Sequence, residues 1–229
     1  MSSVRIEHAV FGAAAVATVS GAVAGSERVQ QFAKPLIAPA LAVGAYLRAR
    51  GTDRNLLLGG LGAATLGDVL LIDPDDDAKL VRGAASFAVM QAAYTALLLR
   101  HNARPTAPAV VPRVVGWLAA AGLVRARSRA VALPLSAYGV TLATATTLAS
   151  DPALAPDART VGGLVVPTAD PRSGLALGAL LFTVSDGLIV FRRLFLRGDA
   201  ARRISEGAIL ATYAAAQYFL VEGMSDLDR

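Results

Sequence analysis

The chain has 229 residues, of which 55% are hydrophobic and only 17% are charged, and its mean hydropathy is +0.52. Soluble domains usually carry about a quarter of charged residues, so this composition argues against a soluble globular protein. Because the chain has no cysteine, it cannot form disulfides, thiolate metal sites or a cysteine nucleophile.

The positive charge of the chain does not indicate a nucleic-acid partner. The formal net charge is +5 and the sequence pI is about 10.1, but the basic residues are almost all arginines at the ends of apolar stretches. Such residues typically anchor helices at a lipid surface. No basic stretch is interleaved with aromatic residues, as a groove for single-stranded nucleic acid requires. We therefore predict a membrane bilayer as a partner and no nucleic acid.

The apolar residues come in long blocks, and these blocks predict transmembrane helices. Inside a bilayer every backbone polar group must be satisfied within the segment, which favours α-helices. We predict an all-α, polytopic membrane bundle forming a single domain over residues 1–229, multi-pass and, in a bacterium, in the inner membrane. The eight predicted spans are residues 8–24, 34–47, 55–72, 80–99, 110–124, 130–150, 173–191 and 204–221.

Three segments of this pattern need comment. The first run ends in Ala-Val-Ala (22–24) and also resembles a signal peptide with a small-residue cleavage site. The second and fifth runs are short for a bilayer that needs about 20 helical residues, and Arg113 interrupts the fifth. We expect that neighbouring helices shield these two, or that Arg113 reaches back to the interface. Residues 151–172, which contain four prolines, form the one long predicted loop.

Two aspartates, Asp68 and Asp186, lie inside apolar stretches. A charge at the centre of a membrane helix costs about 2.5–3.5 kcal/mol on insertion scales, and such residues mark functional sites by default. For each of them a structural role is the alternative. Lys34 begins the second span and is either a cation held near Asp68 or a lipid phosphate, or an ordinary interfacial lysine. We predict that Lys34, Asp68 and Asp186 line one cavity between the second, third and seventh spans.

Further polar residues recur at helical spacing on three other spans. Gln91 and Tyr94 continue a stripe with Gly83 and Phe87 on the fourth span. Each such group alone is typical of contacts between helices in lipid. Together with the two aspartates they predict a hydrogen-bonded cavity. The pairs on the other two spans are Tyr138 with Thr141, and Tyr213 with Gln217.

The motifs that are absent narrow the chemistry. Only His8 and His101 are present, both at span ends, so a zinc site built from several histidines is excluded. There is no G-x-S-x-G elbow, no P-loop and no dinucleotide fingerprint. The acidic run 73–77 either binds Mg or Ca weakly or is a solvated group of charges, and we favour the latter. We predict a metal-independent protein without a cofactor, which leaves carboxylate chemistry.

Five short motifs, taken together, resemble the YhhN family, whose members are eight-span lysoplasmalogenases that include the eukaryotic transmembrane enzymes. They occur in the family's order and cover about residues 34–220. The motifs are KPLIAP (34–39), LGDVLLI (66–72), GAASFAVMQAAY (83–94), LLFTVSDGLIVFRRL (180–194) and ATYAAAQYFL (211–220).

The resemblance implies hydrolysis of the vinyl-ether bond of a lysoplasmalogen, a lysophospholipid, to a fatty aldehyde and a glycerophospho head group. The family often has histidine where this chain has Gln91, so a proton-transfer role is not carried over to that position. The positions that match the family motifs are Lys34, Asp68, Tyr94, Asp186, Tyr213 and Gln217.

Vinyl-ether hydrolysis suits two carboxylates. It begins with proton transfer to the alkene carbon, and water then captures the oxocarbenium ion. One carboxylic acid can donate the proton while a neighbouring carboxylate stabilises the cation or activates water, by analogy with glycosidases. We predict Asp68 and Asp186 as the catalytic pair, with Asp186, deeper by sequence position, as the preferred acid. The remaining candidates, Lys34, Gln91, Tyr94, Tyr138, Tyr213 and Gln217, are predicted to bind substrate.

Two other classes of function remain open from the residues. Intramembrane aspartates also act as proton relays, so a small-solute or proton-coupled transporter is the main alternative. No pair of helices broken by glycine or proline and no internal repeat supports it, although many transporters have both. A membrane scaffold without enzymatic activity is the other alternative.

Overall fold

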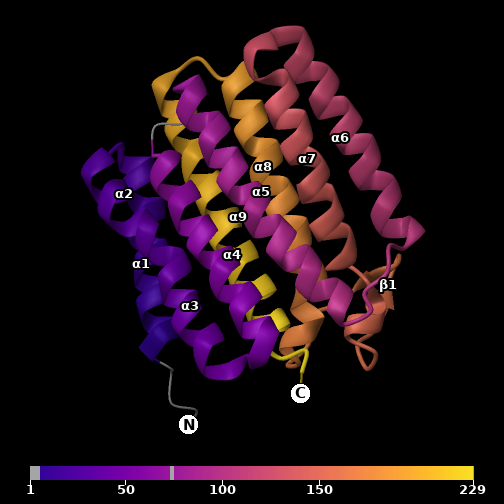
Figure 1. The fold of residues 1–229 in the computed structure, drawn as a ribbon. Coiled ribbons are helices and arrows are strands. Elements are labelled where there is room, and N and C mark those ends of the chain that lie inside the picture. Colours follow the sequence, from indigo (N-terminus) through magenta and orange to yellow (C-terminus); the bar gives the residue numbers. More distant parts are fainter. Residues whose placement is uncertain (1–5, 73–74, 229) are drawn as a thin grey trace.

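The computed structural model describes residues 6–72 and 75–228, which fold into a helical bundle (Figure 1). Because the apolar residues recur in blocks of about twenty, most of the helices are long and run roughly along one axis. The long helices are α1 (Ile6–Ala24), α3 (Ile37–Arg48), α4 (Gly51–Leu70), α5 (Asp77–Arg100), α6 (Ala107–Arg127), α7 (Arg129–Leu148), α8 (Leu175–Phe195) and α9 (Asp199–Ser225). The predicted all-α bundle is thus present.

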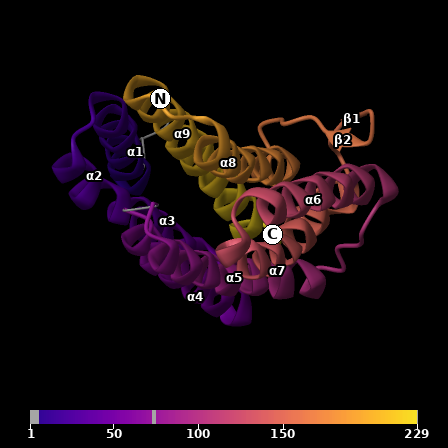
Figure 2. The same cartoon turned by 90° about the horizontal axis from the view of Figure 1, so that it is seen from above.

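The helices pack against one another as a ring with one helix outside it (Figure 2). Each of α1, α3, α4, α5, α7, α8 and α9 contacts the next in that order, and α9 returns to contact α1. Helix α6 lies outside the ring against α7 and α8, and only Ala109 and Val124 of its residues are buried. The side chains that face the interior of the ring are therefore supplied by segments far apart in sequence.

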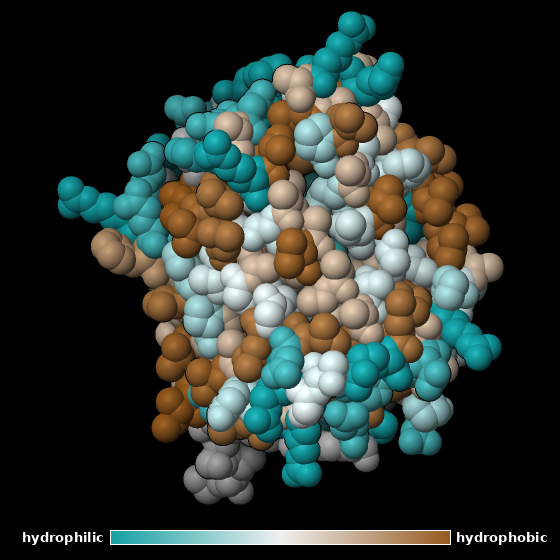
Figure 3. Space-filling view, in the orientation of Figure 1, coloured by the Kyte–Doolittle hydropathy of each residue, from teal (hydrophilic) through white to brown (hydrophobic). Residues whose placement is uncertain are grey.

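Among the residues that the structure describes, four helical segments are long and apolar enough to cross a membrane, which is typical of a membrane protein. They are Ile6–Ala24, Ala107–Arg127, Arg129–Leu148 and Pro171–Phe195. Figure 3 shows hydrophilic residues gathered toward the two ends of the molecule and paler or brown hydrophobic ones between them. The membrane character of the predicted bundle is supported, whereas eight spans are not established by length and composition.

Two predicted spans differ from the observed helices. In place of a span over 34–47, a 3₁₀ turn at Lys34–Leu36 leads into α3, whose 12 residues extend only about 18 Å at 1.5 Å per residue. The predicted span 110–124 was too short, because α6 continues for three residues beyond both of its limits and is 21 residues long. Arg113 does not end this helix, since its guanidinium bonds to Ala109 O, Thr146 Oγ1 and Ser150 Oγ at 2.7–3.0 Å.

Short elements between the long helices were not predicted. Helix α2 (Glu27–Ala33) has seven residues and begins at Ser26, whose hydroxyl accepts a hydrogen bond from Val29 N. The predicted loop 151–172 contains 3₁₀ turns at Pro152–Leu154 and Pro171–Gly174. Between these turns lies a hairpin of β1 (Thr160–Val161) and β2 (Leu164–Val165), paired antiparallel.

The acidic segment before α5 is exposed to solvent and also forms ion pairs. Asp75 pairs with Arg192 and Arg202, and Asp77 pairs with Arg193, so this segment is tied to α8 and α9. Residues 73 and 74 of the predicted run lie outside the described residues. The exposed aspartates agree with the predicted solvated run, and the arginines at the ends of α8 and α9 lie beside them.

Close contact between α4 and α5 depends on glycines that leave room for aromatic rings. A Cβ atom at Gly60 would lie 2.9 Å from Tyr94 Cε1, and one at Gly67 would lie 2.7 Å from Phe87 Cε2. Small residues at helix contacts allow such approach in lipid, where hydrophobicity does not drive helices together. The predicted stripe on α5 therefore faces the bundle interior.

Candidate functional site

An apolar cavity of about 300 Å³ lies among α5, α6, α7, α8 and α9 and reaches the end of α4. We refer to it below as the apolar cavity. Most of its wall is hydrophobic, but polar and charged side chains from six elements reach it. Those predicted from sequence are Lys34, Asp68, Tyr138, Asp186 and Tyr213. The structure thus places Lys34 and the two aspartates around one space, but this space lies mainly among α5 to α9 and not between the predicted second, third and seventh spans.

Asp68 is held near the end of α4 by a hydrogen bond from α9. Tyr213 Oη donates to Asp68 Oδ2 at 2.8 Å, and the aspartate is only 1% exposed. Lys34 is also buried, donates to Leu71 O at 2.9 Å and lies close enough to Asp68 to interact with it electrostatically. Lys34 is therefore a cation of the cavity wall rather than an interfacial anchor.

A chain of hydrogen bonds continues from Asp68 into the bundle. Gln217 Nε2 donates to Tyr213 Oη at 3.3 Å, and Tyr94 Oη donates to Gln217 Oε1 at 3.0 Å. Tyr94 and Gln217 are fully buried behind the cavity and do not line it. These two predicted substrate-binding residues therefore hold Tyr213 in place instead of facing the space.

Asp186 has a simpler environment. Tyr138 Oη donates to Asp186 Oδ2 at 2.5 Å, which joins α7 to α8 across the cavity. The neighbouring Ser185 donates to Ile209 O at 3.0 Å and fixes this part of α8 against α9. Asp186 is half-buried and is therefore more accessible than Asp68. Its position in the middle of α8 coincides with the cavity, which exposes it, whereas Asp68 is enclosed by α9 and Lys34.

Aromatic rings form the wall between the two aspartates. Phe87, Phe182 and Tyr213 pack edge-to-face with centroids 5.7–6.4 Å apart. Such a cluster fixes the orientation of each ring, because every edge meets the face of a neighbour. On the outer side, Trp117 donates to Ser136 O at 2.9 Å and lies against Gly139.

Two further predicted polar residues do not line the cavity. Gln91 is 1% exposed, and its side chain lies beside the Tyr138 hydroxyl, behind the cavity wall. Thr141 donates to Tyr138 O, a bond within α7, and so only supports the helix. Both are contacts within the bundle rather than walls of the site.

Several lining residues were not predicted, and a sequence pattern was available for one of them. Trp117 and Phe182 gave no pattern distinct from an ordinary apolar span. Arg193, however, follows Asp186 by seven residues, which is two helical turns and hence the same helix face. It lines the cavity, although the sequence indicated only an anchor at the membrane surface.

A second group of ionisable residues lies at the other end of the bundle. Asp53 accepts hydrogen bonds from Arg100 Nε at 2.9 Å and His101 Nε2 at 2.5 Å, and Asp228 lies 3.6 Å from His101. Burial tends to raise the pKa of Asp53, but the hydrogen bonds from His101 and Arg100 outweigh it and hold the pKa below its ordinary value. Ligand atoms of the two aspartates and the histidine lie within 4.8 Å of one another. Because Arg100 already occupies one carboxylate oxygen, this group is an ion-pair cluster that joins α4 to α5.

The chemistry that this cavity allows is restricted by its lining. It offers two carboxyl groups, each bonded to one phenol, and the ammonium group of Lys34, within largely apolar walls. Such a space can hold a hydrocarbon chain and expose it to a proton donor and a fixed negative charge.

Comparison with known proteins agrees with the motifs in the sequence. The family model described as the YhhN family matches residues 29–224, which is most of the chain and includes every polar residue of the cavity. Comparisons with curated proteins and with solved structures gave no significant match to either.

Proposed function

The chain belongs to the YhhN family, and we propose that it is a multi-pass membrane hydrolase that cleaves the vinyl-ether bond of lysoplasmalogens or similar ether lysolipids. The observation that carries this proposal is the joint presence of Asp68 and Asp186 on the wall of one apolar cavity. In a bacterium the membrane would be the inner one. The products are a fatty aldehyde and a glycerophospho head group.

A vinyl ether needs an acid rather than a nucleophile, because its alkene is electron-rich. In the proposed reaction Asp186, as the carboxylic acid, transfers its proton to the alkene carbon that is remote from oxygen. The adjacent carbon and the ether oxygen then share a positive charge. Asp186 is suited to this step because it is half-buried and faces the cavity, where the chain would lie.

Asp68 supplies negative charge in the same proposal. The hydrogen bond from Tyr213 and the nearby charge of Lys34 keep it in place, so it stabilises the oxocarbenium ion without reorganising. Water adds to the cation, and its proton returns to the Asp186 carboxylate. The resulting hemiacetal separates into the aldehyde and the glycerol hydroxyl, which restores both aspartates.

The direct test is to incubate the detergent-purified protein with lysoplasmenylcholine and to measure free aldehyde. The matched control substrate has a saturated alkyl ether in place of the vinyl ether and should release nothing. We expect aldehyde release that decreases as pH rises, because the protonated acid is the working form. Purified, folded protein that released no aldehyde from any alkenyl lysolipid, whatever its head group, would falsify the proposal.

A further inference from the structure

A second hollow, of about 560 Å³, lies at the end of the bundle where α6 connects to α7 and α8 connects to α9. We refer to it as the arginine pocket. In contrast to the apolar cavity, its wall is almost entirely polar and charged. It is lined by Asp75, Arg127, Ser128, Arg193, Leu194, Arg197, Asp199 and Arg202.

The arginine pocket adjoins the apolar cavity. Arg193 and Leu194 line both hollows, so the end of α8 is their common wall. Arg193 lies two turns beyond Asp186 on the same face of α8, about 10 Å along the helix axis at 1.5 Å per residue. An amphiphile with its chain in the cavity would therefore present its polar end to these arginines.

The charge of the arginine pocket is suited to an anion. Four arginines and two aspartates line it, a formal excess of two positive charges. Arg202 is bonded to Asp75 and Arg193 to Asp77, whereas Arg127 lies over the Phe195 ring at 4.7 Å. Among the residues that the structure describes, neither Arg127 nor Arg197 forms an ion pair. Two guanidinium groups are therefore available to a ligand.

We propose that the arginine pocket binds the phosphate of the lysolipid head group. This inference rests on the proposed function, because it assumes that the hydrocarbon chain of the same molecule occupies the apolar cavity. Arg127 and Arg197 would donate directly to phosphate oxygens, in the forked geometry that guanidinium offers.

The site makes the phosphate a determinant of substrate choice. A lysophospholipid would be held at both ends, with the ether bond beside Asp186. An alkenylglycerol without phosphate would be held by its chain alone. The proposed site recognises the phosphate and does not select among the groups attached to it, because those groups would extend into water.

The test uses ligands that cannot be cleaved, so that it does not depend on turnover. Binding of 1-O-alkyl-glycerol-3-phosphate and of 1-O-alkylglycerol, with equal chains, is measured on the detergent-purified full chain at low and high salt. We expect the phosphate to raise affinity roughly tenfold or more at low salt, because charged hydrogen bonds to phosphate are strong. The R127Q/R197Q variant should lose most of this preference and keep its affinity for alkylglycerol.

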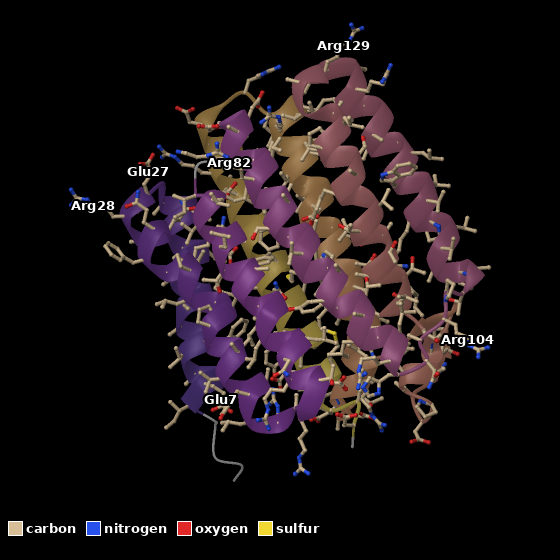
Figure 4. The ribbon with its side chains drawn as sticks, in the orientation of Figure 1. Glu7, Glu27, Arg28, Arg82, Arg104 and Arg129 are labelled. Carbon is tan, nitrogen blue, oxygen red and sulfur yellow. The ribbon has the colours of Figure 1, made fainter. Side chains whose placement is uncertain are left out.

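Arg129 provides the matched control. It is an exposed arginine at the same end of the molecule and points away from the bundle, outside the arginine pocket (Figure 4). R129Q should therefore leave the preference for phosphate unchanged. Inorganic phosphate is included as a competitor, because the pocket could otherwise be a site for the free ion.

Three results would overturn the phosphate site. They are equal affinities of the wild type for the two ligands, an unchanged preference in R127Q/R197Q of normal melting temperature, and displacement by inorganic phosphate at the concentration at which the lipid binds. None of these results bears on aldehyde release. Conversely, phosphate-dependent binding without aldehyde release would leave this site intact and contradict the proposed function.

Discussion

The two carboxylates of the cavity differ in how firmly they are held. Asp68 is 1% exposed and bonds to Tyr213, which is held in turn by Gln217 and Tyr94. Asp186 is half-buried and, among the residues that the structure describes, has one hydrogen-bond partner, Tyr138. A carboxylate fixed by a chain of buried groups is suited to constant charge, whereas one facing an apolar space is suited to exchanging a proton.

The largest effect is expected for the acid. Asp186→Asn should reduce aldehyde release by about 10²–10⁴-fold, because the amide keeps the shape of the side chain and cannot donate the proton. Turnover of lysoplasmenylcholine by purified protein measures this. The matched control is Asp157→Asn, in an exposed loop position, which should have wild-type activity. Near wild-type release from a well-folded Asp186→Asn protein contradicts the carboxylate mechanism.

The next effect sharpens the contrast between the two aspartates. Asp68→Asn should reduce turnover by about 10²–10³-fold, the range seen when one group that stabilises transition-state charge is removed. Because the two residues act in one reaction, the double variant should be little worse than the worse single variant. Losses that multiply in the double variant would show that the aspartates act independently.

The phenols test the same contrast with smaller changes. Tyr213→Phe removes the donor to Asp68 and one of the two acceptors of Gln217 Nε2, so it should lower both turnover and melting temperature. Tyr138→Phe removes one bond to Asp186 and should lower turnover alone. A lost hydrogen bond to a charged group corresponds to about 1.5–3 kcal/mol, or roughly tenfold or more in rate. Equal loss of melting temperature in both variants would contradict the difference in how the aspartates are held.

The smallest effect on activity is expected far from the cavity, at Asp53. The pKa of Asp53 is lower in the folded protein than in the unfolded chain, so its ionised form stabilises the fold above the ordinary aspartate pKa. This contribution is lost as pH falls through the lowered pKa of the folded state. Asp53→Asn should therefore cost about 1.5–3 kcal/mol of stability at neutral pH, and the difference from wild type should vanish in acid. The melting temperatures of the wild type and of Asp53→Asn, measured as a function of pH, test this prediction. A difference between the two proteins that stays constant with pH would refute the ionic role of Asp53. Aldehyde release below the melting temperature should be the same in both.

The sequence predicted the helices and the cavity residues to different extents. Long apolar blocks gave every long helix to within a few residues, since burial of backbone groups in lipid allows little else. Helix α2 was missed because its seven residues are mostly polar, and the hairpin because its strands have two residues each. Asp68 and Asp186 were identifiable because a charge within an apolar run is costly.

The sequence could not show which polar residues line the cavity and which lie behind its wall. Tyr94 and Gln217 have the same spacing pattern as lining residues, yet the packing of α5 against α9 places them behind it. Arg193 is the opposite case: its charge predicted a position at the membrane surface, but it lies on the same helix face as Asp186 and lines the cavity. Periodicity gives the face of a helix, and only the neighbours of that helix decide what the face meets.

The contact between Gly67 and Phe87 gives the glycine a part in the chemistry. Asp68 meets Tyr213 directly through the phenol oxygen, and Gly67 meets the same ring through Phe87, whose centroid lies 5.7 Å from that of Tyr213. The two neighbouring residues thus act on the same ring: Gly67 leaves the space that Phe87 needs, and Asp68 accepts the hydrogen bond from Tyr213. A single methyl group at position 67 would displace a phenyl ring, the phenyl would displace a phenol, and an unaltered carboxylate would lose its partner.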